Sequence, residues 1–494
     1  MLNIPKRIEE VLRSSPRLES WRTLHPRSTA FLLKLATRAG LQLTAGVLVA
    51  ALCWFAFFGV IQDLLANDPL VRADLRIMAF LQTLRAPEFN QVMVLFTDLA
   101  NWQIVIAGAV ILALFMYRYR QWWWLAALAL CLAGEQLLSH VLKWLFARDR
   151  PDLHNALIPA AGGSFPSGHV LAGSIFYGFV ACYIASQTRS WSVRIAIVAG
   201  AVLLVVGIGF SRVYLGVHWP SDVIGSFALG PAWVATVLIV LSAGWIPQPG
   251  HQPKPVPTWH LWAGFGIWLL VVAGYYVLTD PIVTPVSPKL ATVALGSQEF
   301  DARLFDNVPR FTEDITGAAI EPINAVFIGS EADLVQALAA SGWIKAVPLG
   351  IGSGLRLLWA ELRNQPDPNA PGVPAFLSSV PNEMTFERPT ALNSARERHH
   401  LHVWSTSLTK DGKPVWVGTV HQDVSGTLYR GLTYHKIDPD VDSERAQLRD
   451  TLQASACLSR QHAISVTAPM KGQNILHNTF FTDGMALEFE LQCK

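Results

Sequence analysis

Charged residues are scarce in this chain of 494 residues, because Asp, Glu, Lys and Arg together make up only 15% of it. Soluble domains usually carry about 25%, so this scarcity excludes an ordinary soluble protein over the whole length. Hydrophobic residues reach 51%, and there are 18 Trp. This composition is typical of an integral membrane protein with a soluble part attached, and the length is too great for one ordinary domain.

A strong net charge is also lacking. The formal charge is +2 and no polybasic tail is present, so nothing in the composition suggests a nucleic-acid partner. The first 40 residues carry eight Lys and Arg against three Glu, yet no short apolar core with a small-residue cleavage site follows them. We therefore expect an uncleaved basic segment over residues 1–40, lying in the cytoplasm.

Apolar stretches long enough to cross a bilayer follow this segment. About 20 helical residues cross about 30 Å of hydrocarbon, and seven stretches of the chain reach that length. The predicted spans are 41–65, 91–116, 121–146, 169–187, 194–211, 222–245 and 259–279.

The short loops predict the orientation. Basic residues gather on the cytoplasmic side of membrane proteins, and the loops at 118–120 and 188–194 are basic like the N-terminus. The loops 66–90, 147–168 and 212–221 then face outward, and residues 73–86 can form an interfacial helix there. An odd number of spans puts the C-terminal part outside as well, in the periplasm next to a bacterial inner membrane.

The sequence changes character at about residue 280. A Pro-rich linker is followed by globular sequence. Residues 322–330 are predicted as a buried strand, 399–408 and 413–422 as strands with alternating burial, and 331–343 and 443–455 as helices, which together indicate an α+β domain. We therefore expect four segments: the basic segment 1–40, a six-span membrane domain over 41–245, a loop and seventh span over 246–280, and a soluble domain over 281–494.

Cysteine is rare, with five in the chain. Cys53, Cys131 and Cys182 fall within predicted spans, where a buried thiol behaves as a small apolar group. Cys457 and Cys493 both fall in the C-terminal domain. An oxidising compartment permits a disulfide between them that would pin the end of the chain, although both thiols could instead simply be buried.

Three polar clusters interrupt the apolar sequence, all in or beside the outward loops. The first has Lys143 and Arg150, the second runs PSGH from Pro166, and the third has Arg212, His218 and Asp222. Arg and Lys suit phosphate oxygens, and a helix that starts at a Ser-Gly-His sequence favours an anion. His218 and Asp222 are four residues apart, so the carboxylate can hold one ring nitrogen and make the other a better nucleophile.

This constellation closely resembles the type 2 phosphatidic acid phosphatase family, which shares its core with the vanadium haloperoxidases. The family pattern K-x6-RP, PSGH and SR-x5-H-x3-D is complete over residues 40–245. The resemblance implies a helix bundle that needs neither a metal nor a cofactor. It implies His218 as the nucleophile, Asp222 as its orienting partner and His169 as the proton donor to the leaving group. The residues implied to bind phosphate are Lys143, Arg150, Ser167, Gly168 and Arg212.

The resemblance predicts a phosphatase that cleaves a phosphomonoester or pyrophosphate of a polyprenyl or glycerolipid through a phosphohistidine, at the outer face of the membrane. Membrane spans on both sides of the motifs argue against the soluble haloperoxidase branch. Two other functions stay open: a transporter or secretion component with a vestigial site, and an enzyme that passes the phosphoryl group between lipids. Asp98, in the second predicted span, could face the mouth of the site.

The C-terminal domain resembles the LssY C-terminal domain family, through segments such as RHHLHVW, GKPVWVGTVHQD and FFTDG. The resemblance predicts no activity. His400, His402 and His421 lie in predicted strands, and His435 precedes an acidic stretch. A metal site or second catalytic site there is one interpretation, and polar strand faces with an acidic helix start are the other.

Overall fold

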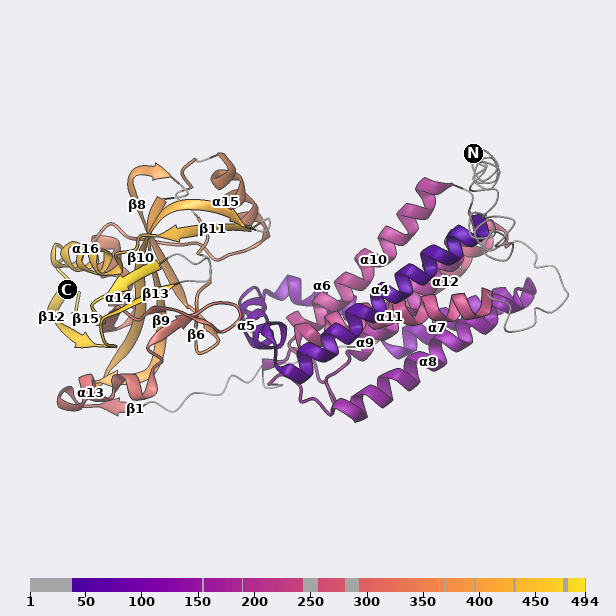
Figure 1. Ribbon diagram of the computed structural model, residues 1–494, viewed down its shortest axis with the longest axis horizontal. Helices are drawn as coiled ribbons and strands as arrows, with labels where there is room; N and C mark the ends of the chain where they lie inside the picture. Colours follow the sequence, from indigo (N-terminus) through magenta and orange to yellow (C-terminus); the bar gives the residue numbers. More distant parts are fainter. Residues whose placement is uncertain are drawn as a thin grey trace, which may run out of the picture. The chain divides into compact units, whose positions relative to one another are not determined.

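The computed structural model describes residues 38–152, 155–188, 190–242, 256–279, 293–363, 365–367, 370–372, 374–394, 397–429, 432–473 and 479–493 (Figure 1). Contacts divide the chain into two units. The first comprises Met1–Val71 and Arg85–Val286, and the second comprises Arg72–Leu84 and Ser287–Lys494. The predicted segment boundaries at residues 40, 245 and 280 remain predictions.

The regular structure described in the first unit is helical. Its helices are α4 (Arg38–Ala66), α6 (Pro87–Asp98), α7 (Trp102–Arg118), α8 (Trp122–Phe146), α9 (Gly168–Gln187), α10 (Trp191–Tyr214), α11 (Pro220–Ser242) and α12 (Thr258–Leu278). Helix α5 (Pro69–Thr83) follows α4 in the chain, and most of it belongs to the second unit.

Six of the described helices are long and apolar enough to cross a membrane, or seven spans if α6 and α7 are counted as one. The chain is thus a multi-pass membrane protein by this measure. The predicted second span over 91–116 is wrong as a continuous helix, because α6 and α7 meet at a bend of 46°. The polar residues at this break, Asp98 and Asn101, hydrogen-bond to each other and need partners that a straight lipid-facing helix does not supply.

Helices α9 and α11 lie at the centre of the bundle, since about half of each apolar segment is buried, against 11% for α10 and α12. Helix α11 packs against α4, α8 and α9. Close approach of α8 to α11 depends on Gly134, where a Cβ atom would lie 2.2 Å from the ring of Trp233. This packing brings together the ends of α8, α9, α10 and α11, where the three polar motifs lie.

The second unit is built on a mixed β-sheet. Its strands run in the order β12-β15-β4-β10-β9-β8-β5, with β1 beside β9 and β11 beside β10. The pairs β4–β15 and β1–β9 are parallel, and the others are antiparallel. The strands of this sheet are β1 (Val293–Leu295), β4 (Ala325–Ile328), β5 (Ile344–Lys345), β8 (Met384–Ser394), β9 (Glu397–Lys410), β10 (Lys413–Tyr429), β11 (Leu432–Ile437), β12 (Leu458–Ser465) and β15 (Met485–Leu491).

Two small sheets accompany it. One has the order β3-β2-β6-β7, and the other pairs β13 with β14. Their strands are β2 (Phe311–Glu313), β3 (Ala319–Pro322), β6 (Phe376–Leu377), β7 (Val380–Pro381), β13 (Met470–Gln473) and β14 (Thr479–Thr482). The helices of this unit are α13 (Ser297–Asn307), α14 (Glu331–Ala340), α15 (Ile351–Arg363) and α16 (Val441–Gln453).

Both faces of the main sheet are covered. Apolar residues of α14 and α16 form one core with the sheet, and α13 contributes to the core on the other side. The predicted strands at 322–330, 399–408 and 413–422 and the helices at 331–343 and 443–455 are confirmed as β4, β9, β10, α14 and α16. The alternating pattern expected for HHLHVW is wrong: these six residues are all buried, because the sheet is covered on both sides.

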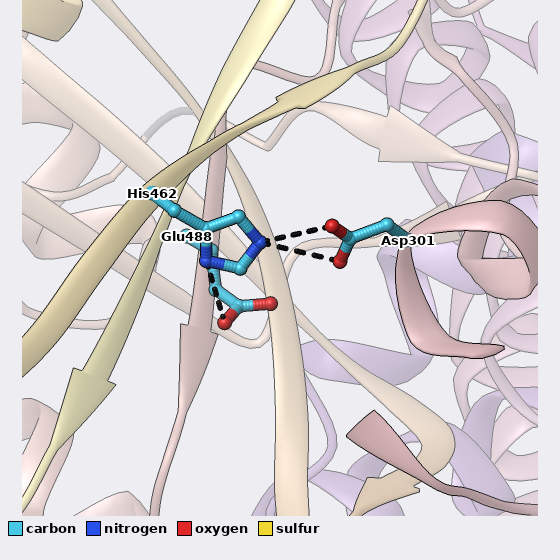
Figure 2. A group of neighbouring side chains, drawn as sticks. All are labelled: Asp301, His462 and Glu488. Carbon is cyan, nitrogen blue, oxygen red and sulfur yellow. Dashed lines mark hydrogen bonds and ion pairs between the residues drawn. The ribbon is translucent and has the colours of Figure 1, made fainter. Parts of the chain in front are cut away.

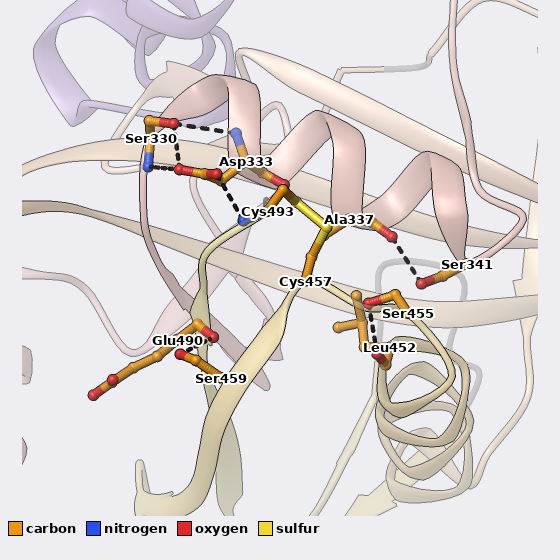
Figure 3. Close-up of a disulfide and its surroundings, with 10 residues drawn as sticks. All are labelled: Ser330, Asp333, Ala337, Ser341, Leu452, Ser455, Cys457, Ser459, Glu490 and Cys493. Atoms are coloured by element: carbon orange, nitrogen blue, oxygen red, sulfur yellow. Dashed lines mark hydrogen bonds between the residues drawn. A yellow bond between two sulfur atoms is a disulfide. The ribbon is translucent and has the colours of Figure 1, made fainter.

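A disulfide joins Cys457 and Cys493, which confirms the predicted pairing, with their Cα atoms 4.2 Å apart (Figure 3). Cys457 follows α16 and Cys493 follows β15. The backbone N–H of Cys493 also donates to Asp333 Oδ1 at 3.0 Å, beside the N-terminus of α14. The C-terminal end of the described chain is therefore held both covalently and by a hydrogen bond.

Candidate active site

The loop between α10 and α11 carries the predicted nucleophile. Both His218 and Asp222 are buried, with 1% and 0% of their surface exposed. Nδ1 of His218 lies 3.4 Å from Asp222 Oδ2. Helix α11 begins at Pro220, which suits the first helical turn because its missing N–H would have no partner there. Asp222 thus lies in the first turn, where the helix dipole favours a carboxylate.

Asp222 has further partners that fix its position. Its Oδ2 accepts hydrogen bonds from the backbone N–H of Trp219 at 3.0 Å and from the Ser164 hydroxyl. Its other oxygen accepts from Arg148 Nη1 at 2.6 Å. A buried carboxylate needs such donors to remain ionised, so Asp222 can hold a proton on Nδ1 of His218 without moving.

Arg150 contacts the other nitrogen of the His218 ring. Its Nη1 lies 3.1 Å from Nε2 and donates to the carbonyl of Val217 at 2.7 Å. The rest of its guanidinium donates to the carbonyls of Ala161 and Gly162, each at 2.9 Å. Because Arg150 is always a donor, Nε2 accepts here, which assigns the proton of a neutral ring to Nδ1.

The pKa of His218 agrees with this tautomer. Burial lowers the pKa most, and the charges of Arg212 and Arg150 also lower it. The hydrogen bond and charge of Asp222 offset only part of this, so the pKa lies at about 3. The ring is therefore neutral near pH 7, with a lone pair on Nε2. A neutral imidazole with an unprotonated Nε2 can act as a nucleophile toward phosphorus.

The remaining predicted phosphate-binding residues lie around the same point. Arg212 is 4% exposed and donates from Nη1 to Thr97 Oγ1 at 2.7 Å. Among the described residues, its Nε and the buried Ser167 hydroxyl have no hydrogen-bond partner. A Cβ atom at Gly168 would lie 3.2 Å from Lys143 Nζ. Two buried donors without partners beside two cations form a site suited to an anion.

His169 lies in the first turn of α9 and belongs to the same cluster of side chains. It interacts electrostatically with Arg212, His218, Lys143 and Arg150. Its Nε2 lies 2.8 Å from Asn101 Oδ1.

The amide of Asn101 is itself held in place, because its Nδ2 donates to Asp98 Oδ1 at 2.8 Å and to the Tyr275 hydroxyl at 3.0 Å. Oδ1 of Asn101 therefore accepts, and Nε2 of His169 carries a proton. The second nitrogen, Nδ1, is left for proton exchange.

All eight residues predicted from the motifs thus come together at one end of the bundle. The sequence analysis missed Arg148, Ser164 and Asn101. Arg148 lies two residues before a motif position, so a second Arg in ARDRP was a usable signal. Ser164 and Asn101 offered none, since they approach Asp222 and His169 only through the fold.

The histidines of the C-terminal domain form a separate buried cluster on one face of the sheet. His400 and His421 are cross-strand partners on β9 and β10, and His402 lies two residues along β9. Nδ1 of His421 lies 3.0 Å from Glu321, and Nε2 of His400 lies 2.8 Å from Asp423. Burial is the largest effect on the pKa of His421 and lowers it. The charge and hydrogen bond of Glu321, together with the charges of Asp423 and Glu444, outweigh burial and raise the pKa to about 9.

This cluster is a charge-paired network in the protein interior. His402 behaves differently from His421, because burial and then the charges of His421 and His400 hold its pKa well below the ordinary value. The side chain of His435 lies outside the described residues. Asp440, in the acidic stretch after it, caps α16 by accepting from the backbone N–H of Ser443, which agrees with the acidic-helix-start interpretation.

Asp301, His462 and Glu488 form a second titratable group, with ligand-type atoms close enough together to hold a metal ion. Figure 2 shows the ring of His462 between the two carboxylates, with Nε2 3.1 Å from Asp301 and Nδ1 3.3 Å from Glu488. Lys410 Nζ contacts Glu488 at 2.6 Å. Because the ring bridges the carboxylates and an ammonium already pairs with Glu488, the group is arranged as an ion-pair network.

Comparison with known proteins agrees with this architecture. Residues 122–245 match the PAP2 superfamily, and residues 305–486 match the LssY C-terminus. Phosphatidylglycerophosphatase B of Bacillus subtilis is 33% identical over 179 residues, which are 36% of this chain and 87% of that protein. An undecaprenyl-diphosphatase of Sulfolobus acidocaldarius is 31% identical over 114 residues, which are 22% of this chain and 50% of that protein.

A solved structure is also similar. It is a transmembrane PAP2 type phosphatidylglycerolphosphate phosphatase from Bacillus subtilis, 28% identical, with a TM-score of 0.34, covering 39% of this chain and 94% of that one. The extent of the match to the first relative establishes the family: the chain belongs to the PAP2 superfamily, and a domain similar to the LssY C-terminus follows its membrane-spanning part.

Proposed function

We propose that the protein is a metal-independent lipid phosphate phosphatase that works through a phosphohistidine on His218. The observation that carries the proposal is the environment of Nε2: it bears a lone pair, lies 3.1 Å from Arg150, and belongs to a ring whose Nδ1 faces Asp222. The relatives support a lipid substrate, because they are named as a phosphatidylglycerophosphatase and an undecaprenyl-diphosphatase.

The reaction has two steps. Nε2 of His218 attacks phosphorus, so a P–N bond forms while the P–O bond to the lipid breaks. For this step His169 is protonated on both ring nitrogens, and it gives the proton on Nδ1 to the departing oxygen. Water then attacks phosphorus, so a P–O bond forms while the P–N bond to His218 breaks. His169 takes the proton of that water on Nδ1, and phosphate leaves.

The cations stabilise the charge that develops on the phosphoryl oxygens. Arg150 and Arg212 offer planar donors, Lys143 a point charge, and Ser167 a hydroxyl, while Gly168 lets the phosphate approach the start of α9. No carboxylate cluster is needed in this scheme, so no metal is required at the phosphate.

We place this site at the outer face of a bacterial inner membrane, with the C-terminal domain in the periplasm. The disulfide between Cys457 and Cys493 supports that side, since disulfides persist in oxidising compartments. Substrates of the undecaprenyl pyrophosphate or phosphatidate type fit a site that binds only the phosphoryl group and leaves the tail to the membrane.

A panel of lipid phosphates tests the proposal. Purified protein in detergent micelles should release inorganic phosphate from at least one polyprenyl or glycerolipid phosphate, and His218→Ala should release none. A second assay adds an acceptor lipid: phosphate that appears on the acceptor, with none free, would instead indicate transfer between lipids. Absence of both products across the panel would favour a vestigial site.

A further inference from the structure

Helix α15 of the C-terminal domain exposes an apolar side, which a helix on the surface of a soluble domain usually buries. The helix, Ile351–Arg363, is labelled in Figure 1. Surface helices normally bury their apolar stripe against the core. Here four large apolar residues are exposed instead, and the exposed fractions are 63% for Leu355, 41% for Leu358, 57% for Trp359 and 58% for Leu362.

The spacing shows that these four residues share one stripe. The other three follow Leu355 by three, four and seven positions. At about 100° of rotation per residue, this spacing confines the four side chains to an arc of about 100° on the helix. The residues that α15 buries lie on the opposite side: Leu357 and Ala360 are each 7% exposed, and Glu361 is 4% exposed. The helix therefore buries a carboxylate toward the domain and presents three Leu and a Trp outward.

Basic side chains flank this stripe. Arg363 lies over the ring of Trp359, with its guanidinium carbon 4.0 Å from the ring centroid. Arg356 lies on the same edge and pairs with Asp367 at 3.1 Å. A Trp and Leu face edged by Arg is the composition of helices that lie in the headgroup region of a membrane, where long basic side chains reach the phosphates.

The chain also keeps this domain close to a membrane. Fourteen residues separate the end of α12 at Leu278, a candidate membrane span, from the first strand at Val293. At about 3.5 Å per residue, such a segment reaches at most about 50 Å. A lipid surface is thus an apolar partner that stays within reach of the domain, at a high effective concentration.

We propose that the apolar stripe of α15, formed by Leu355, Leu358, Trp359 and Leu362, docks on the surface of an anionic phospholipid bilayer. Binding buries the stripe in the headgroup region, while Arg363 contacts lipid phosphates. The C-terminal domain then has two attachments to the membrane, the covalent linker and α15. This role is independent of the phosphatase reaction.

A fluorescent label on the full-length protein tests the proposal. Leu358→Cys is made in a Cys53→Ala, Cys131→Ala, Cys182→Ala background, labelled with an environment-sensitive fluorophore, and reconstituted in vesicles with about one third phosphatidylglycerol. Some vesicles carry doxyl groups near the headgroup end of the acyl chains. We expect at least twofold quenching by the doxyl lipids.

The matched control is Gln336→Cys, an exposed polar position on α14 of the same domain, which should be quenched little. A further variant adds Trp359→Glu and Leu362→Glu to the Leu358→Cys protein, and its quenching should fall to the control level. Equal quenching at positions 358 and 336 would overturn the proposal. An unquenched label, together with disulfide-linked dimers of the unlabelled Leu358→Cys protein, would also overturn it, because the stripe would then contact a second copy.

Discussion

We predict that replacing Arg148 lowers the rate of phosphate release, although this residue lies outside the family motif. Its Nη1 donates to Asp222 Oδ1 at 2.6 Å and to the Ser221 hydroxyl at 2.8 Å. Arg148→Ala leaves one oxygen of a fully buried carboxylate without this donor. A hydrogen bond to a charged group contributes about 1.5–3 kcal/mol, which corresponds to a fall of about 10- to 150-fold in kcat/KM.

The loss should be smaller than that of removing the carboxylate. The other oxygen of Asp222 keeps Trp219 and Ser164 as donors, so His218 retains an oriented partner. Asp222→Asn, by contrast, should lose about 10⁴ in kcat, as the loss of an orienting carboxylate can cost in a Ser-His-Asp triad. The ranking His218→Ala, Asp222→Asn, Arg148→Ala therefore follows from the contacts.

The assay is phosphate release from a short-chain lipid phosphate, with kcat and KM measured separately. Because Arg148 acts through Asp222, kcat should carry most of the change, with KM altered by less than about threefold. Arg148→Lys should recover part of the rate, since it restores a charge and one donor.

Arg118→Ala, which removes another Arg at a helix end, should behave as wild type and serves as the matched control. Unchanged kcat in Arg148→Ala, with the melting temperature preserved, would refute this reasoning.

Three further predictions follow from the site and the disulfide. His169→Ala should lose much less activity with an activated ester, whose leaving group needs no proton, than with a lipid phosphate; equal losses with both would contradict its role as acid. Activity on a soluble ester should survive EDTA and be inhibited by vanadate, whereas a strict requirement for Mg²⁺ would remove the metal-free mechanism. Replacing Cys457 and Cys493 together by Ser should destabilise the C-terminal domain by about 3–4 kcal/mol, because the bridge closes a loop of 36 residues; a melting temperature equal to that of wild type would contradict this.

The sequence predicted which residues gather at the candidate site, because the motif positions lie at the ends of helices that pack together. His218 and Asp222 are close in the chain, and their spacing alone allows contact. The donors Arg148 and Ser164 reach Asp222 from 74 and 58 residues away. Only the packing of α8 and α9 against α11 creates these contacts, so local patterns could not reveal them.

The sequence predicted the helices and strands, but it did not predict the bend in the second span or the burial of both faces of β9. Hydropathy identified the second span but not its bend, since the bend depends on side-chain contacts of Asn101 with His169 and Tyr275. The strand β9 looked half-exposed because His is polar. His399 and His400 of this strand are in fact buried beside Glu444 and Asp423, and pairing of this kind cannot be read from one strand.

The central claim is a covalent phosphohistidine at His218. The most direct test is to react the purified protein with a lipid phosphate labelled with ³²P, quench it in denaturant at alkaline pH, and map the label by mass spectrometry. A phosphoramidate is stable in base and labile in acid, so we expect base-stable label on the peptide that contains His218, and none in His218→Ala. Label on another residue, or steady turnover by His218→Ala, would contradict the mechanism.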